Sequence, residues 1–282
     1  IAVNPVLDGS NAMPYDMDRT DKELSLAEFT RKGIELLDNP NGFFLMIEGG
    51  KIDWACHAND AAAAIGDTFA FDAAVKEALA FAEKHPDETL IIVVGDHETG
   101  GMSIGFAGTQ YETFFEKIAH QKESYEAFDR KIAAFRKESE KTFEKMMPLI
   151  TGSFGLRTAT PEERAALEEK ARAGDDEARI ALSMTLSELE LGELRAAFEN
   201  SMLEKKERAK DEATFLLYGG YEPLSVKITH ILNRKAGIGW TSYAHTGIPV
   251  PLFAAGLGSE LFAGYYDNTD VAWKTMSILG VR

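Results

Sequence analysis

Carboxylates and imidazoles follow two short apolar segments of the chain, residues 43–47 and 89–94. These side chains are Glu48, Asp53 and His57 after the first segment, and Asp96 and His97 after the second. Asp53 and His57 are four residues apart, a spacing that places two side chains on one face of a helix. A carboxylate and an imidazole placed in this way can chelate one divalent cation.

Each of these residues also has an ordinary structural explanation. A pair such as Asp96-His97 is as often a capping aspartate beside a surface histidine, and Glu48 could cap a helix or form an ion pair. Two acidic segment ends with nearby histidines are harder to explain structurally, because burying carboxylates without a counter-charge costs several kcal/mol per ion. One or two divalent cations would remove that cost.

A further candidate ligand is His245, in a turn-rich loop before an apolar segment at residues 250–254. A hydrogen-bonded loop histidine is the alternative explanation for this residue. The remaining histidines have contexts typical of helix ends or polar helix faces; they are His85, His120 and His230. The one cysteine, Cys56, is expected to be a buried free thiol, since a thiolate suits an oxygen-rich metal site poorly.

Strands and a helix must position these side chains. Residues 43–47 and 89–94 are continuous apolar runs bounded by glycines, which predict strands buried on both faces. Residues 60–84, between them, carry an apolar stripe of helical period. Strand, helix and strand predict an α/β fold with a mostly parallel central sheet flanked by helices. Because ligands bind beyond the carboxyl ends of such strands, we expect the candidate residues to face one crevice.

The composition divides the chain into three regions. Residues 1–110 are predicted to form the first part of the α/β core, residues 111–212 a charged helical insert, and residues 213–282 the final part of the core. We expect the insert to lie outside the sheet, to expose its charges on solvated helix faces and to contribute no metal ligand. Ser25 with Glu28, and Thr160 with Pro161, have the spacing of helix starts.

Charge and hydropathy exclude several classes of function. The 282 residues include 30 Lys and Arg against 46 Asp and Glu, a net charge of −16, which opposes binding to a nucleic-acid backbone. No run of about 18 apolar residues occurs, so no membrane span is expected. One cysteine excludes an intrachain disulfide and a cysteine-based zinc finger. The chain opens at Ile1 without an initiator Met or a signal peptide, as a mature product or a fragment would.

Taken in order, these motifs resemble the carboxyl-terminal half of an alkaline phosphatase. The matching segments are residues 43–53 with His57, 89–101 with Asp96-His97-Glu98-Thr99-Gly100-Gly101, 240–241 with 245–247 and 250–251, and 262–264 with 267–269. The resemblance covers roughly residues 10–110 and 213–282, and the helical region between them corresponds to a variable insert.

The resemblance implies a role for each candidate residue. Glu48 resembles a magnesium-site carboxylate; Asp53, His57 and His245 resemble the three ligands of one zinc; and Asp96 and His97 resemble two ligands of a second zinc. The complete enzyme would hold two Zn²⁺ and one Mg²⁺ and hydrolyse phosphate monoesters through a covalent phospho-enzyme. A periplasmic or extracellular location is also implied, and a homodimer is left open.

The chain also departs from the family pattern. The nucleophilic serine or threonine, the aspartate shared by two metals and the phosphate-binding arginine have no match, so we assign no catalytic residue. We therefore expect a carboxyl-terminal fragment that is inactive alone. Two alternatives stay open: a phosphodiesterase, sulfatase or metal-dependent mutase on the same scaffold, and a non-catalytic helical interaction module formed by residues 111–212.

Overall fold

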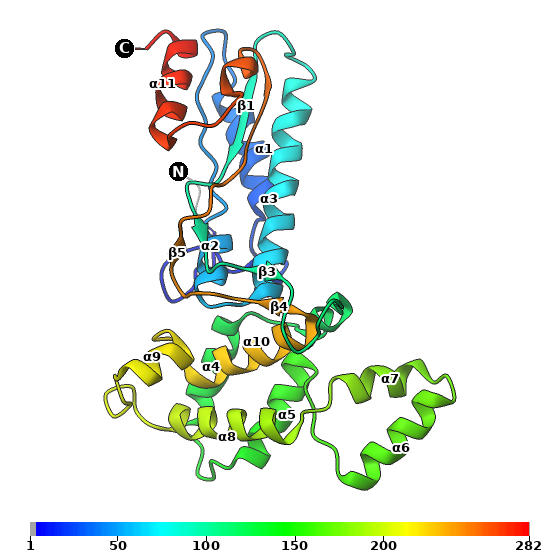
Figure 1. Ribbon diagram of the computed structural model, residues 1–282. Coiled ribbons are helices and arrows are strands. Elements are labelled where there is room, and N and C mark those ends of the chain that lie inside the picture. The colour runs from blue at the N-terminus through cyan, green and yellow to red at the C-terminus, as the bar shows by residue number, and fades with distance from the viewer. Residues whose placement is uncertain (1–3, 282) are drawn as a thin grey trace.

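The computed structural model describes residues 4–281, which form an elongated molecule with two parts (Figure 1). One part contains α1, α3, α11 and the strands β1 and β6, and the other contains the helices α4 to α10. The helices are α1 Leu26–Leu37, α2 Lys51–His57, α3 Ala61–Ala82, α4 Tyr125–Phe135, α5 Phe143–Phe154, α6 Pro161–Arg172, α7 Asp176–Ser183, α8 Glu188–Met202, α9 Glu212–Tyr218, α10 Pro223–Ala236 and α11 Asn268–Leu279. The strands are β1 Leu90–Val94, β2 Glu98–Thr99, β3 Ser103–Ile104, β4 Ile238–Gly239, β5 His245–Thr246 and β6 Leu252–Gly256. Within residues 4–281, no helix combines the length and the hydropathy that crossing a membrane requires.

Helix starts follow the predicted capping signals. At α1, the Ser25 side chain accepts a hydrogen bond from the Glu28 amide, and the Glu28 carboxylate accepts one from the Ser25 amide at 2.8 Å. The same reciprocal pair joins Thr160 and Glu163 at the start of α6. Both predicted starts are confirmed. They could be predicted from the sequence because a capping box depends only on residues three positions apart.

The predicted parallel sheet is wrong for the described residues. Residues 43–47 run between α1 and α2 without forming a strand, and the predicted strand at 89–94 is confirmed as β1. β1 pairs with β6, and the pair is antiparallel, with Ile92 opposite Ala254. Each of the three sheets in residues 4–281 has two antiparallel strands. The apolar runs indicated extended segments, but they carried no information about which segments pair.

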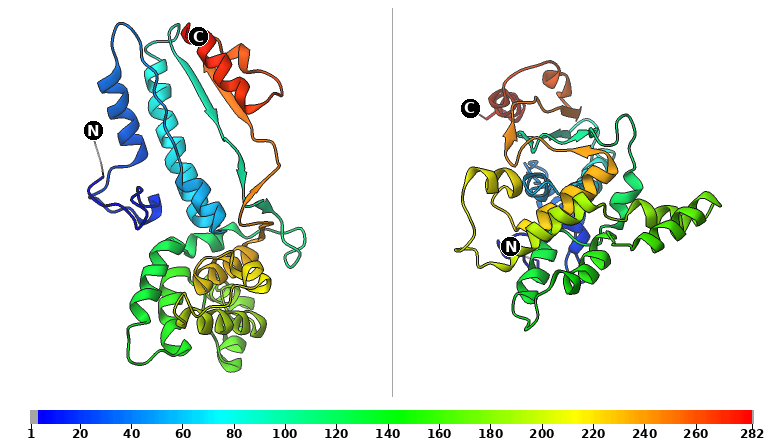
Figure 2. Two further views of the ribbon diagram at one scale, coloured as in Figure 1. Left: turned by 90° about the vertical axis from the view of Figure 1, so that its left-hand side faces the viewer. Right: turned by 60° about the horizontal axis from the view of Figure 1, so that its bottom comes forward.

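Two very short ladders lie where the two parts of the molecule meet (Figures 1 and 2). β2 pairs with β5, and β3 pairs with β4, so residues 98–104 lie beside residues 238–246. Gly100 strengthens this contact, because its amide donates to the Ala244 carbonyl and its own carbonyl accepts from the amides of Thr241 and Ser242. Its φ of +84° and its close approach to Trp240 leave no room for a side chain.

The largest hydrophobic cluster lies in the helical part. Most of its residues come from α4, α5, α8 and α10, and they include Phe128, Ile150, Leu194, Ile228 and Ile231, all fully buried. α10 lies after residue 212, so a helix assigned by sequence to the final part of the core shares its packing with the helices of residues 111–212. The three-region division itself stays a prediction.

A corner between α2 and α3 connects several parts of the molecule. Asn59 is buried in a left-handed conformation, with φ +52°. Its side-chain nitrogen, Nδ2, donates to the backbone carbonyls of Cys56 and Ser242, both at 2.9 Å. The backbone carbonyl of Asn59 accepts a hydrogen bond from the side chain of Asn233 in α10 at 2.7 Å. The adjacent Asp60, also buried, accepts from the side chain of Gln121 and from the Tyr125 amide.

We predict that Asn59→Ala lowers the free energy of unfolding by about 3 kcal/mol. The variant removes the side-chain partner of the Ser242 carbonyl and of the His230 ring, and alanine tolerates the left-handed region less well than asparagine does. Asn11→Ala is the matched control, since Asn11 has φ +61° but is exposed; its cost should stay near 1 kcal/mol. Urea denaturation of both variants measures the difference, and equal costs would contradict the role of the Asn59 side chain.

A second prediction concerns pH and Asp129 in α4. Burial raises the pKa of Asp129 from 3.8 to about 7, although the Ser225 hydroxyl donates a hydrogen bond to its carboxylate. A raised carboxyl pKa destabilises the fold as pH rises from about 4 to about 7. Asp129→Asn should therefore stabilise the protein at pH 8 by about 2–4 kcal/mol, and less at pH 5.

Thermal unfolding between pH 5 and pH 8 measures this gain for Asp129→Asn. Asp87→Asn, at an exposed position, is the control and should change stability little at either pH. A gain that did not depend on pH would contradict the assignment.

Candidate metal centre

Asp53 and His57 lie one turn apart on α2, as their spacing predicts. The Asp53 Oδ1 and His57 Nε2 atoms are 3.4 Å apart. His57 Nδ1 lies 2.6 Å from the backbone carbonyl of Tyr243. Because a carbonyl only accepts hydrogen bonds, this contact places a proton on Nδ1, and Nε2 is the ring nitrogen that faces Asp53. This is the arrangement of a metal-binding histidine whose second nitrogen is held by the protein.

The β2–β5 ladder brings His245 to this pair from the far end of the sequence. Thr99 of β2 is directly opposite His245 of β5. The Thr99 hydroxyl donates to Asp53 Oδ1 at 2.6 Å, so the same residue fixes the carboxylate and aligns the strand that carries the histidine. His245 Nε2 then lies 3.8 Å from Asp53 Oδ1 and 3.2 Å from His57 Nε2.

These three distances fit a tetrahedral metal. Zinc bonds to nitrogen and oxygen of about 2.0–2.1 Å separate two ligand atoms of a tetrahedral site by about 3.3–3.4 Å. The three observed separations are 3.2, 3.4 and 3.8 Å. One carboxylate and two imidazoles are also a typical zinc donor set. The three separations are therefore compatible with one zinc ion held by Asp53, His57 and His245.

His97 lies close to the same atoms but in a different orientation. Ligand atoms of Asp53, His97 and His245 all lie within 4.8 Å of one another, which makes a second, overlapping triad. However, the His97 ring stacks on the His245 ring, with centroids 3.5 Å apart and planes 18° apart. Two rings stacked face to face hold their nitrogens in nearly parallel planes and do not aim them at one shared point. We therefore favour His57 over His97 as the partner of Asp53 and His245.

Asp96 and Glu48 lie at the margin of this cluster. Asp96 Oδ2 is 3.3 Å from His97 Nε2, and 87% of its side chain is exposed. Glu48 is exposed and lies beside Gly50 at the start of α2. Within residues 4–281, the Glu48 side chain forms no hydrogen bond or ion pair with any other candidate ligand. Four candidate residues therefore lie together in the structure: Asp53, His57, His97 and His245. Asp96 contacts this group through His97, and Glu48 forms no such contact with any of them.

The neighbouring side chains support the site without entering it. Glu98 accepts hydrogen bonds from the Gly101 amide at 2.8 Å and from the Thr246 hydroxyl, so it braces the loop. Burial raises the pKa of the Cys56 thiol to about 12, with the carboxylates of Asp53 and Glu98 adding to the shift. A thiol with so high a pKa stays protonated and makes a poor zinc ligand.

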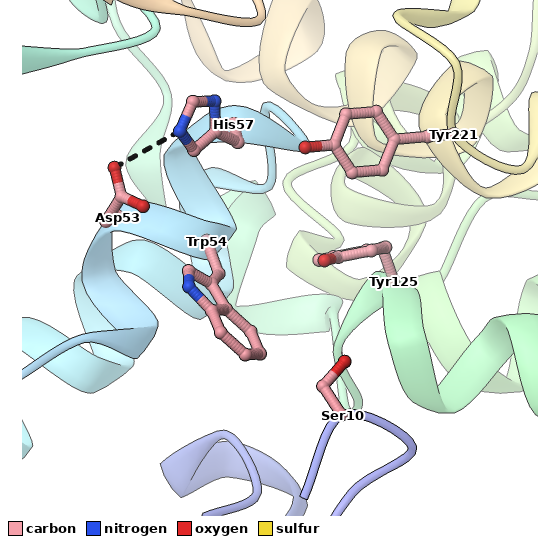
Figure 3. A pocket seen from close by; sticks show the side chains of 6 residues that line it. All are labelled: Ser10, Asp53, Trp54, His57, Tyr125 and Tyr221. Carbon is pink, nitrogen blue, oxygen red and sulfur yellow. Dashed lines mark ion pairs between the residues drawn. The ribbon is translucent and has the colours of Figure 1, made fainter. Parts of the chain in front are cut away.

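A cavity of about 330 Å³ opens beside Asp53 and His57 (Figure 3). Its lining includes Trp54 from α2 and two tyrosines of the helical part, Tyr125 and Tyr221. Ser10, which the sequence does not nominate as a nucleophile, also lines it. Figure 3 shows the carboxylate and the imidazole on one side of the cavity and the aromatic rings on the others. A small ester could therefore be held against the candidate metal ligands.

Several residues of the site are not evident from the sequence. Thr99 lies inside the recognised motif, but nothing in its type or spacing marks it as the partner of Asp53. The carbonyl of Tyr243 and the side chain of Asn59 carry no sequence signal. His230 was expected on a polar helix face, yet burial lowers its pKa to about 3, and it hydrogen-bonds the side chain of Asn59 at 3.1 Å.

Comparison with known proteins shows the family of the chain. Residues 7–281 match the family described as Alkaline phosphatase. Alkaline phosphatase 3 of Bacillus subtilis (strain 168) is 32% identical over 268 residues, which cover 95% of this chain and 46% of that protein. Alkaline phosphatase 4 of the same organism is 31% identical and is covered to 45%.

Solved structures give the same family. The cold-active alkaline phosphatase of a Shewanella species superposes with a TM-score of 0.64 and 27% identity, covering 95% of this chain and 53% of that one. The Thermus thermophilus alkaline phosphatase has a TM-score of 0.67 and 23% identity, and it supports the fold. The chain spans about half the length of the relatives that it matches. The chain belongs to the alkaline phosphatase family.

Proposed function

We propose that this chain is the metal-binding, carboxyl-terminal part of a zinc-dependent phosphatase that hydrolyses phosphate monoesters. The observation that carries the proposal is the set of three ligand separations among Asp53, His57 and His245, which match the edges of a zinc tetrahedron. Family membership supports the substrate class. By the same resemblance, we propose that the complete protein acts in the periplasm or outside the cell.

Each residue of the site has a role in this proposal. Asp53, His57 and His245 would hold one zinc, and Asp96 and His97 would supply two ligands of a second. Glu48 is the proposed magnesium ligand. A zinc ion bound in such a site stabilises negative charge on an ester oxygen. The Thr99 hydroxyl and the Tyr243 carbonyl fix the orientation of Asp53 and His57 before any substrate binds.

The cavity beside α2 would hold the organic part of the ester. The rings of Trp54, Tyr125 and Tyr221 offer apolar surface, and the open side admits water for hydrolysis. Nothing in this cavity matches the family's phosphate-binding arginine. We therefore propose that the residues needed for turnover come from the part of the fold that this chain does not match.

Zinc affinity tests the assignment of the first site. We predict that the wild-type chain binds zinc, that Thr99→Val weakens binding about 10- to 100-fold, and that His57→Ala or His245→Ala weakens it further. The threonine variant removes the hydroxyl that orients Asp53 and that also lies 3.2 Å from His97 Nδ1, whereas the histidine variants each remove a ligand. Competition with a chromogenic chelator measures the affinities. His85→Ala is the control and should bind as wild type does; equal affinities for His57→Ala and His85→Ala would contradict the site.

Turnover tests the proposed fragment character. We predict that purified residues 1–282, supplied with zinc and magnesium, hydrolyse a chromogenic phosphate monoester far more slowly than about 1 s⁻¹, near the low end for enzymes. The second zinc would have only Asp96 and His97, below the usual three protein ligands. A rate near 1 s⁻¹ would overturn this prediction, and its loss in Ser10→Ala would then identify Ser10 as the nucleophile. Diester and sulfate-ester substrates, assayed with the complete protein, separate the related activities.

A further inference from the structure

The side-chain amide of Asn59 joins the end of α2 to the segment that carries His245. Its nitrogen, Nδ2, donates to the Cys56 carbonyl in the last turn of α2 and to the Ser242 carbonyl, both at 2.9 Å. These two bonds use both N–H groups of the amide. The amide oxygen, Oδ1, then lies 3.1 Å from His230 Nε2 of α10. If the amide were rotated by half a turn, Oδ1 would face two carbonyl oxygens, and both bonds would be lost.

The His230 ring is the donor to the Asn59 oxygen. Burial, and after it the cations Lys227 and Arg234, lower the pKa of His230 to about 3. The Glu193 carboxylate opposes this shift without cancelling it. The ring is therefore neutral at physiological pH and carries one proton. Because Asn59 Oδ1 only accepts hydrogen bonds, the contact places that proton on Nε2.

His230 also reaches the residue that holds a proposed zinc ligand. The Tyr243 carbonyl, next to that of Ser242, lies 2.6 Å from Nδ1 of His57. The Tyr243 ring stacks on the His230 ring, with centroids 5.9 Å apart and planes 24° apart. His230 therefore acts on the segment 242–245 both through the Asn59 amide and through the Tyr243 ring.

We propose that His230 is a positioning residue for the zinc centre: its Nε2–H group keeps the Asn59 amide in the orientation that ties the segment 242–245 to the end of α2. The inference rests on the proposed zinc site. It gives the helical part of the molecule a defined effect on that site, because α10 carries His230 and none of the proposed ligands. Loss of the donor frees the Asn59 amide, loosens the Tyr243 carbonyl from His57 and reduces zinc affinity.

Two substitutions separate the hydrogen bond from the packing of the ring. His230→Gln has no ring, but its amide nitrogen can reach nearly the position of the imidazole Nε2 and donate to Asn59. His230→Phe keeps a ring beside Tyr243 but has no donor. We predict that His230→Phe weakens zinc binding about 10-fold, the lower end for losing an outer partner of a metal ligand, and that His230→Gln binds nearly as wild type does. Competition with a chromogenic chelator measures both affinities.

His85→Phe is the matched control and should bind zinc as wild type does, since His85 contacts Phe81 and Glu88 at the end of α3. Equal affinities for His230→Phe and the wild type would overturn the proposal. Equal weakening in His230→Phe and His230→Gln would also overturn it, because the packing of the ring, and not its hydrogen bond, would then set the affinity.

Nitrogen NMR of the metal-free chain, with isotope-labelled histidine, tests the same bond without zinc. At about pH 8, where an ordinary histidine is neutral, His230 should carry its proton on Nε2 and His57 should carry its proton on Nδ1. His230→Phe should replace the single form of His57 by a mixture of the two neutral forms, and His230→Gln should preserve the single form. A proton on Nδ1 of His230, or a His57 signal that His230→Phe leaves unchanged, contradicts the proposal.

The NMR readout also separates two kinds of failure. If the wild-type chain binds no zinc, the proposed zinc site is wrong, and the histidine spectra still decide whether His230 orients Asn59 and His57. If the wild-type chain binds zinc but the His230 variants follow another order, the zinc site stands and the positioning role is wrong. The wild-type spectrum alone decides whether His230 is the donor, so the proposal stays testable when a variant does not fold.

Discussion

The corner between α2 and α3 is the constraint on which the site depends, because it joins parts of the chain that are more than 180 residues apart. His57 bonds the Tyr243 carbonyl, and Asn59 bonds the Ser242 carbonyl, across separations of 186 and 183 residues. Together with the β2–β5 ladder, these bonds hold the segment that carries His245 against α2. The hydrogen bonds at the corner are partly or fully shielded from water, so they are costly to leave unmade.

The same corner links the site to the helical part. Asn59 and His230 contact each other, Asn233 donates to the Asn59 carbonyl, and Asp60 holds Gln121 and the start of α4. The helices α4 and α10 therefore hold the residues that follow α2 in place, although none of the side chains of these two helices is a proposed ligand. This explains how a charged helical region with a large core of its own can matter for the site without taking part in its chemistry.

The sequence predicted features that depend on neighbouring residues. It did not predict which strands pair or which distant residues form hydrogen bonds. Capping boxes, the helical pair Asp53 and His57, and the apolar run of β1 each depend on residues a few positions apart, so their pattern is visible in the chain. The antiparallel pairing of β1 with β6 depends on segments that are distant in sequence. Asn59 and Thr99 were missed because single hydrogen bonds between distant residues leave no periodic signal. His245 was a candidate because of its loop before an apolar segment, but its grouping with Asp53 and His57 came from the family resemblance.

The central claim is that Asp53, His57 and His245 together hold one zinc ion. Zinc-edge X-ray absorption of the chain loaded with one equivalent of zinc tests it most directly. The account predicts a first shell of nitrogen and oxygen at about 2.0–2.1 Å, with outer-shell scattering from two imidazole rings. A sulfur scatterer at about 2.3 Å, which would place Cys56 on the metal, or scattering without imidazole, would contradict it.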